Sequence, residues 1–337
     1  MIRKVLIILL LFVTGSCMKY GPLTTETFEP ELSSKGLFIV NEGNFMYGNA
    51  SLSYYDPQSG IVENEVFIRA NGINLGDVAQ SMTIHNGLGY IVINNSGVIF
   101  VIDPDTFRLM GNITGLISPR HIHFINDRKA YVTDLYRERI TIIDPVTYSI
   151  TGFINTPGHR STEEMVQWEK YLFVSCWSYD NKILVIDTQT DKVADSIEVG
   201  QQPSRMILDK NNKIWCAASG EIYRIDTPTG TIEKIFTVSN DASYSYLAIN
   251  ATKDTLFILN RDVWRMGANE DILPVKPFIR NRDSRYYGLA VDPATSHIYL
   301  ADAIDYVQPG KIYRFDPDGR PVDTLTAGIN PGAFCFK

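Results

Sequence analysis

Two pairs of closely spaced residues have side chains that could bind a metal ion or catalyse a reaction. His121 and His123 are two positions apart in a strand-like segment, so they should lie on the same side of that strand. A metal site would need further ligands, and the spacing indicates no partnered His, Asp or Glu group. Glu163 and Glu164 are adjacent, so a strand would point them to opposite faces, and we expect them in a solvated loop. We therefore predict no metal site and no catalytic residues, and the chain has no GxSxG, P-loop or GxGxxG motif.

Aromatic and arginine side chains recur in the short segments that separate the strand-like runs. Examples are NEGNFMYGN, DLYRER, CWSYDN, RNRDSRYY and ADAIDYVQPG. A single loop tyrosine can simply pack against neighbouring loops, but a large apolar patch at a surface usually marks binding. Together they give these candidate ligand-binding residues: Phe45, Tyr47, Arg120, His121, Tyr136, Arg160, Trp177, Tyr179, Arg205, Tyr244, Tyr246, Arg285, Tyr286, Tyr287 and Tyr306.

The elements that position these residues follow from a repeat. Six apolar runs end on an aspartate, at Asp56, Asp103, Asp144, Asp187, Asp226 and Asp316. Their spacings are 47, 41, 43, 39 and 90 residues, so a seventh unit should fill the last gap, where VWRMG lacks the aspartate. A period of roughly 40 to 45 residues with several short strands is typical of a β-propeller. The sequence therefore predicts an all-β, seven-bladed propeller over residues 36–337.

Alternation of apolar and polar residues supports four short strands in each unit. In the fourth unit we expect an inner strand at residues 205–208 and further strands in YLFVSCW, KILVID and KVADSIEV. The repeated aspartates precede Pro or Thr, so they are expected to form turns by accepting backbone N–H groups two residues on. No segment longer than the amino-terminal leader shows helical periodicity.

The ring should be closed by its last strand. The first unit begins at LFIV, which aligns with second strands, and its missing innermost strand appears at the far end in NPGAFCFK. Pairing the two would leave no open sheet edge at the seam. The innermost strands should also point Ser81, His121, Glu164, Arg205, Tyr246 and Gly288 toward the axial channel.

In a propeller, the loops between blades and those between second and third strands share one face. The candidate residues lie in these loops or at the start of the inner strands, so we expect them at one end of the ring. A mixed ring of polar and aromatic residues there is more typical of the floor of a binding site than of side chains that simply fill the channel.

Composition limits the class of partner. The net charge is −7 and no run of Lys and Arg is present, which argues against a nucleic-acid partner. Three cysteines follow Cys17, namely Cys176, Cys216 and Cys335, and none has metal-ligand spacing. We expect Cys216 and Cys335 to behave as small buried hydrophobic side chains, and we expect no disulfide framework.

The amino terminus resembles a processing signal. Arg3 and Lys4 precede the apolar run from Val5 to Val13, and the segment ends in Thr-Gly-Ser-Cys, which is similar to a bacterial lipobox. Residues 1–17 are therefore predicted to be a lipoprotein signal peptide with Cys17 lipidated. Residues 18–35 are predicted to be a flexible tether.

Several motifs resemble the YncE-like surface propeller lipoproteins of Gram-negative gut bacteria. They are NEGNFMYGNASLSYYDPQSG, LGDVAQSM, YIVINNSGVIFVIDPDT, GLISPRHI and KAYVTDLY. Among these lipoproteins, the chain is similar to the BtuG type. That resemblance implies an outer-membrane, surface-exposed, lipid-anchored protein that binds cobalamin and sits on a TonB-dependent transporter.

Our first hypothesis is accordingly a non-catalytic protein that captures a corrinoid such as vitamin B12, as ligand and not as cofactor. The alternatives are a propeller lactonase or lyase using His121, Glu164 and Arg205, or a protein-interaction module at the surface.

Overall fold

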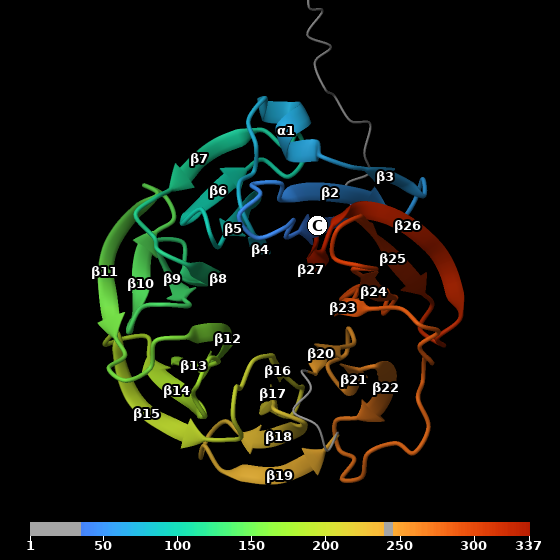
Figure 1. The fold of residues 1–337 in the computed structure, drawn as a ribbon. Helices are drawn as coiled ribbons and strands as arrows, with labels where there is room; N and C mark the ends of the chain where they lie inside the picture. The colour runs from blue at the N-terminus through green and yellow to red at the C-terminus, as the bar shows by residue number, and fades with distance from the viewer. Residues whose placement is uncertain (1–34, 239–244) are drawn as a thin grey trace, which may run out of the picture.

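The computed structural model describes residues 35–238 and 245–337, and the structural statements that follow concern these residues. Seven small antiparallel sheets stand around a central axis, and each forms one blade (Figure 1). This confirms the predicted all-β propeller. Cys17 and Tyr244 lie outside the described residues, as does the predicted tether up to residue 34.

The strands of the seven blades have the following bounds. Blade 1 contains β27 (Pro331–Phe336), β1 (Leu37–Asn41), β2 (Ser51–Asp56) and β3 (Ile61–Glu63). Blade 2 contains β4 (Ala79–His85), β5 (Leu88–Ile93), β6 (Val98–Ile102) and β7 (Leu109–Ile113). Blade 3 contains β8 (Pro119–Asn126), β9 (Lys129–Asp134), β10 (Arg139–Asp144) and β11 (Ser149–Asn155). Blade 4 contains β12 (Thr162–Trp168), β13 (Tyr171–Cys176), β14 (Lys182–Asp187) and β15 (Lys192–Glu198). Blade 5 contains β16 (Met206–Leu208), β17 (Lys213–Ala218), β18 (Glu221–Asp226) and β19 (Ile232–Thr237). Blade 6 contains β20 (Tyr246–Ile249), β21 (Thr255–Asn260) and β22 (Asp262–Gly267). Blade 7 contains β23 (Tyr286–Val291), β24 (Ile298–Asp302), β25 (Pro309–Phe315) and β26 (Pro321–Ile329).

The last strand closes the ring as predicted. β27 pairs antiparallel with β1, from Leu37 opposite Phe336 to Asn41 opposite Pro331. The first blade is thus built from both ends of the described chain. β1 is therefore paired on both sides.

The six repeated aspartates form turns, also as predicted. The Asp56 side chain accepts the Gln58 N–H at 2.8 Å, and Asp187 accepts the Gln189 N–H at 2.8 Å. Asp103, Asp144 and Asp316 accept backbone N–H groups in the same manner, and Asp226 accepts the N–H of Thr229, three residues on. These carboxylates are therefore used by the turns between third and fourth strands.

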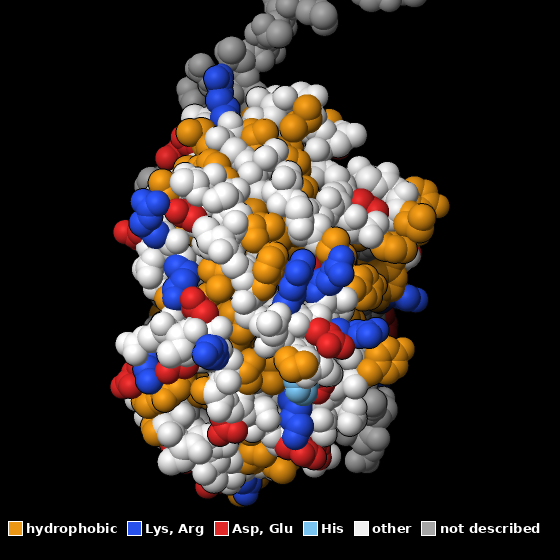
Figure 2. Space-filling view, turned by 90° about the vertical axis from the view of Figure 1, so that its left-hand side faces the viewer, with side chains coloured by type: hydrophobic (Ala, Val, Ile, Leu, Met, Phe, Trp, Pro, Cys, Tyr) orange, Lys and Arg blue, Asp and Glu red, His pale blue; other side chains and the backbone are white. Residues whose placement is uncertain are grey.

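The core is divided into seven parts, one between each pair of neighbouring blades. For example, Tyr131, Ile140, Leu172 and Leu184 pack between blades 3 and 4. Because both faces of a blade are covered in this way, the second and third strands carry nearly continuous apolar runs. The outer wall mixes acidic and basic side chains, as Figure 2 shows for the side on which β11 lies.

Two local predictions were wrong, and one short helix was not predicted. Met206–Leu208 pairs with β17 in blade 5, so the strand expected for the fourth unit belongs to the fifth. Blade 6 has three strands, with only an isolated bridge between Val263 and Ile279 beyond β22. The short helix α1 (Val66–Asn71) interrupts the link from blade 1 to blade 2. Its six residues are too few to show a helical period. No helix among the described residues has the length and apolarity needed to cross a membrane.

Candidate functional site

Aromatic side chains gather at one end of the ring. Inner strands begin at this end, so the loops between second and third strands open onto it as well. Of the six exposed aromatic side chains among the described residues, five lie in these loops, and only Phe153 lies on an outer strand. With their apolar neighbours they form what we call the aromatic rim: Phe45, Met46, Tyr47, Tyr136, Tyr179, Tyr306 and Val307. Tyr179 is 95% exposed and Tyr47 is 78% exposed, so neither contributes to the core.

Bulges at the start of the inner strands determine which residues reach the hub. In β8, Pro119 pairs with Asp134 and Ile122 with Val132, which leaves two residues opposite one. In β12 the same shift occurs between Thr162 and Met165. Shifts also occur in β4 and β23. A bulge re-aims side chains, so two consecutive residues of one strand face the axis.

Of the two consecutive residues that a bulge turns toward the axis, the first lines a cavity of about 320 Å³. We call this cavity the central pocket. All seven blades contribute to it, through Glu42, Val78, Gln80, Arg120, Glu163, Trp177, Ser204, Arg205, Ser245, Tyr246 and Tyr287. Below it, Ser81, His121, Glu164, Arg205 and Tyr246 line the channel, as expected from the inner-strand alignment. Gly288 is buried and does not line it.

Arg120 and Glu163 form a buried ion pair in the central pocket. The guanidinium donates through Nε at 2.6 Å and Nη2 at 2.7 Å to the two oxygens of Glu163, and through Nη1 at 2.6 Å to Gln80. Burial alone would raise the pKa of Glu163, but Arg120 and His121 outweigh it and hold that pKa well below its ordinary value. The guanidinium also lies 5.6 Å from the Trp177 ring centroid. Arg120 is therefore fixed and its charge is compensated.

A second ion pair lies on the neighbouring strands. Arg205 donates to Glu164 and lies 5.0 Å from the Tyr246 ring centroid. The expectation that Glu163 and Glu164 lie in a solvated loop was wrong. Both belong to β12, and the bulge directs both toward the hub, each to its own arginine.

Glu42 is the acidic residue of the pocket without an arginine partner. Tyr287 donates its hydroxyl to the Glu42 carboxyl at 2.8 Å. Burial raises the pKa of Glu42 above its ordinary 4.5, against the lowering by Tyr287, Arg120 and Arg205. The floor of the pocket thus combines two compensated guanidinium groups with a carboxyl group that resists ionisation.

His121 lies in the channel beside both glutamates, but its geometry is not that of a catalytic pair. Its Nε2 is 3.5 Å from Glu163 and 3.7 Å from Glu164, and it makes no hydrogen bond within the described residues. His123 points its Nε2 to Gln167 at 2.9 Å. The two histidines therefore have different partners, although both line the lower channel.

One group with metal-ligating atoms was not indicated by spacing. His159, Cys176 and Asp180 offer ligand atoms within 4.8 Å of one another, and they come together from two loops and a strand end. His159 is already 2.8 Å from the Asp180 carboxylate. Burial raises the pKa of the Cys176 thiol, which disfavours the thiolate that a metal would bind. We assign no metal to this group. Cys216 and Cys335 are buried free cysteines, as expected, and Cys176 is buried and free as well.

The structure divides the remaining candidate residues between rim, pocket and elsewhere. Phe45, Tyr47, Tyr136, Tyr179 and Tyr306 belong to the rim, while Arg120, Trp177, Arg205, Tyr246 and Tyr287 line the pocket. Arg285 lies at the rim, 5.9 Å from the Tyr306 ring centroid. Arg160 is exposed and lines no cavity described here, and Tyr286 packs against the core between blades 6 and 7.

Sequence reasoning missed Glu42, Gln80 and Glu163 in the pocket. Simple alternation of strand residues hides Gln80 and Glu163, because the bulge adds a residue at each position. A signal was present in the sequence: three inner strands carry two consecutive polar or charged residues near their start, Gln80-Ser81, Arg120-His121 and Glu163-Glu164. Glu42 gave no such signal, because it follows a second strand.

The strands and the hub pocket define a seven-bladed β-propeller with an aromatic rim and a polar pocket at one end. The chain belongs to the family described as Domain of unknown function (DUF5074), whose model matches residues 35–328. No curated protein matches it.

Three solved structures share the fold at low sequence identity. A quinonprotein alcohol dehydrogenase-like protein from Bacteroides thetaiotaomicron is 14% identical, with a TM-score of 0.71, covering 90% of this chain and 78% of that one. A periplasmic gluconolactonase from Pseudomonas aeruginosa is 14% identical, with a TM-score of 0.67, covering 90% and 98%. Hydrazine synthase from Kuenenia stuttgartiensis is 13% identical, with a TM-score of 0.63, covering 76% and 89%. At such identity these similarities show the fold alone.

Proposed function

We propose that this protein is a non-catalytic binding protein that captures a corrinoid such as vitamin B12 at the aromatic rim. The observation that supports this most directly is the position of five exposed aromatic side chains around a polar pocket. Exposed rings cost solubility, and a cluster of them at one end of a ring usually marks a binding surface.

The chemistry of a corrinoid matches the two parts of this surface. A corrin is a broad disc with apolar edges, so it suits the rings of the rim. Its amide arms suit the pocket, where Gln80, Ser204 and Ser245 offer neutral hydrogen-bonding groups. Because both arginines are already paired with glutamates, the pocket favours a neutral arm over an anionic one.

The apolar surface of the rim is sufficient for measurable binding. If four rim aromatics each lost about 100 Å² of apolar surface, the gain would be about 10 kcal/mol at about 25 cal/mol per Å². Ordering costs of about 4 kcal/mol or more reduce this sum. The remainder, about 6 kcal/mol at most, corresponds to a Kd of roughly tens of micromolar, and hydrogen bonds in the central pocket would supply the rest of a micromolar affinity.

The proposal also includes delivery of the captured corrinoid to a transporter. A lipid anchor at Cys17 would hold the propeller at the cell surface of the outer membrane. A TonB-dependent transporter would receive the corrinoid. The transporter would contact the rim loops that the bound ligand does not cover. Copurification of such a transporter from membranes tests this part separately.

Equilibrium dialysis against cyanocobalamin tests the binding proposal. The protein should retain the red ligand, and replacing Tyr136 and Tyr179 together by Ala should weaken binding at least tenfold. Phe153→Ala is the matched control, because Phe153 is exposed but lies on an outer strand beneath Arg139. Absence of retained colour at micromolar ligand would remove the proposal.

A second candidate function is a lactonase or lyase. The observation in its favour is that His121, Glu164 and Arg205 do meet at the hub. A screen of lactones and sugar derivatives, with metal analysis, tests it. Turnover that His121→Ala abolishes would replace the binding proposal with this one.

A further inference from the structure

Three exposed arginines lie together at the rim, where blade 6 meets blade 7. Arg261 is at the tip of the hairpin between β21 and β22, and Arg282 and Arg285 are in the link that leads to β23. We call them the arginine cluster. The whole chain carries a net charge of −7, so this local excess of positive charge is opposite to the average.

Hydrogen bonds fix the backbone that carries the arginine cluster. Asn281 donates through Nδ2 to the carbonyl of Arg261 at 2.9 Å and to that of Ser284 at 3.0 Å. Its Oδ1 accepts the Ser284 N–H at 2.8 Å, which closes a tight loop around Arg282. One asparagine thus joins the hairpin tip to the link, and the three arginines start from a preorganised backbone.

The positive charges of the arginine cluster are not compensated. Within residues 35–238 and 245–337, none of its guanidinium groups makes an ion pair, whereas Arg120 and Arg205 each bind a glutamate. The carboxylates beside the cluster are used by the backbone. Asp262 accepts the Asn281 N–H at 2.7 Å, and Asp302 accepts the Arg285 N–H at 2.9 Å.

The arginine cluster adjoins the aromatic rim and the central pocket. The guanidinium of Arg285 lies 5.9 Å from the ring centroid of Tyr306, which in turn lies 5.7 Å from that of Tyr287. Tyr287 lines the central pocket and donates its hydroxyl to Glu42. A ligand that covers the pocket and this part of the rim therefore ends beside Arg285.

The central pocket and the arginine cluster favour different charges. Both arginines of the pocket are paired with glutamates, so an anionic group gains little there. Free guanidinium groups bind phosphate well, because their N–H groups donate in pairs to its oxygens. The anionic side group of vitamin B12 is the phosphodiester that joins the corrin to its nucleotide tail. Of these two regions, the arginine cluster has the charge that this group requires.

We propose that the arginine cluster binds the phosphodiester of the nucleotide tail, so that the protein selects corrinoids that carry the tail over those that lack it. This inference rests on the proposed corrinoid binding, and it adds which corrinoids are preferred. It also orients the ligand: the nucleotide tail lies toward blades 6 and 7, and the amide arms lie over the central pocket.

Cobinamide provides the matched ligand, because it has the corrin and most of the amide arms but no nucleotide tail. Calorimetric titration should show that the wild-type protein binds cyanocobalamin at least tenfold more tightly than dicyanocobinamide. The preference should shrink when the salt is raised from about 0.05 M to about 0.5 M, because exposed charges are screened.

Replacing Arg282 and Arg285 together by Gln separates the phosphodiester from the rest of the tail. The double variant should bind cyanocobalamin at least tenfold more weakly and dicyanocobinamide within about twofold of the wild type. Arg108→Gln is the matched control, because Arg108 is exposed in the turn between β6 and β7 at the opposite end of the ring. It should leave both affinities unchanged.

The possible failures are distinguishable. The inference is wrong if the wild type binds both ligands equally, or if the double variant weakens both ligands to the same extent or neither. Loss of transporter copurification in the double variant, with both affinities unchanged, would assign the cluster to a protein partner instead. If neither ligand binds the wild type, the proposed corrinoid binding itself is wrong.

Discussion

At the scale of single residues, the bulges explain why the hub carries charged side chains in two levels. Arg120 and Glu163 occupy the upper level, and His121 and Glu164 lie directly below them. Each arginine meets a glutamate from the next or preceding blade, so the charges also link the blades. Sequence alternation predicted the lower level, and the upper level required knowledge of the bulges.

Glu163→Gln should destabilise the fold. The substitution removes one partner of a buried pair and leaves the Arg120 charge uncompensated, which costs about 3 kcal/mol. Urea unfolding at pH 7 measures the loss. Asp318→Asn is the control, because the Asp318–Arg320 pair is exposed and worth at most about 1 kcal/mol. Equal stability of the two variants would mean that the buried pair contributes nothing.

The effect of Glu163→Gln should depend on pH with a defined sign. The folded-state pKa of Glu163 lies below its ordinary 4.5, so its contribution is present above pH 4.5 and is lost as the pH falls. The stability difference between wild type and variant should therefore shrink on acidification below pH 4.5. A difference that stays constant would contradict the charge-based explanation.

Glu42→Gln should have the opposite effect. The folded-state pKa of Glu42 is raised, so the wild-type protein loses stability as the pH rises from 4.5 through that pKa. Glutamine does not ionise and still accepts the Tyr287 hydroxyl. The variant should match the wild type near pH 4 and exceed it at pH 8, measured by urea unfolding. Lower stability at pH 8 would show that the carboxylate is favourable.

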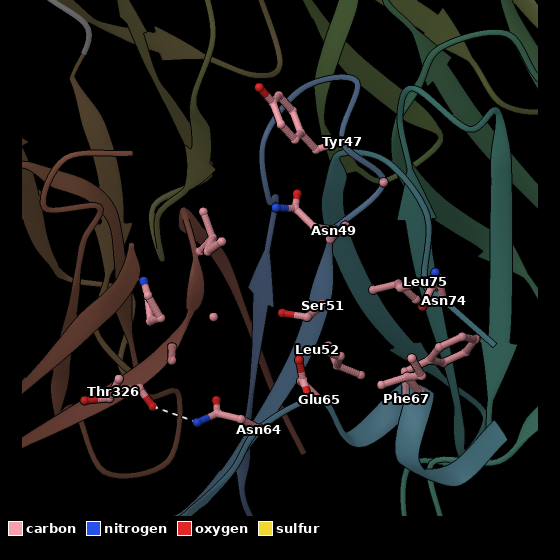
Figure 3. Close-up of a pocket in the computed structure, with 17 residues that line it drawn as sticks. Tyr47, Asn49, Ser51, Leu52, Asn64, Glu65, Phe67, Asn74, Leu75 and Thr326 are labelled. Atoms are coloured by element: carbon pink, nitrogen blue, oxygen red, sulfur yellow. Dashed lines mark hydrogen bonds between the residues drawn. The ribbon is translucent and has the colours of Figure 1, made fainter. Parts of the chain in front are cut away.

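At the scale of elements, patterns that repeat in sequence were predictable and unique ones were not. The turn aspartates and the β1–β27 closure follow from alignment of the units with one another. The helix α1 and the three-stranded sixth blade each occur once, so no other unit reveals them. Residues in and around α1 also line a cavity of about 580 Å³ that sequence reasoning did not indicate (Figure 3).

Deleting residues 331–337 should abolish cooperative folding. The deletion removes five residue pairs between β27 and β1, and it removes Phe334 and Phe336 from the core near Tyr299. At about 1 kcal/mol for each hydrogen bond and about 2 kcal/mol for each phenylalanine, the loss is on the order of 8 kcal/mol. That is comparable with the whole stability of a typical protein, about 5 to 15 kcal/mol.

Thermal unfolding followed by circular dichroism measures this loss. A synthetic peptide of residues 331–337 should restore a cooperative transition when added to the truncated chain, and a scrambled peptide should not. A truncated chain that melts within a few degrees of the full chain would show that closure by β27 is dispensable.

At the scale of the whole molecule, the repeat predicted the ring, and the ring determined which loops share a face. That was enough to place ten of the candidate residues at the rim or in the central pocket. It was not enough to separate Tyr286, which packs into the core, from Tyr287, which reaches the pocket. At a bulge, two neighbouring side chains can point to different places. The sequence does not show where the pairing register shifts.

The central claim is that the rim and the pocket act together as one binding surface for a corrinoid. Both Trp177→Ala and Tyr246→Ala remove a ring that borders the pocket and lies against an arginine. Each variant should therefore lose affinity while the ring of blades stays folded, which thermal unfolding would verify.

Calorimetric titration of the purified protein with cyanocobalamin tests this claim most directly. We predict one ligand per chain, a Kd in the micromolar range or below, and at least tenfold weaker binding to Trp177→Ala and Tyr246→Ala. The absence of heat at micromolar ligand, or unchanged affinity in both variants, would contradict it.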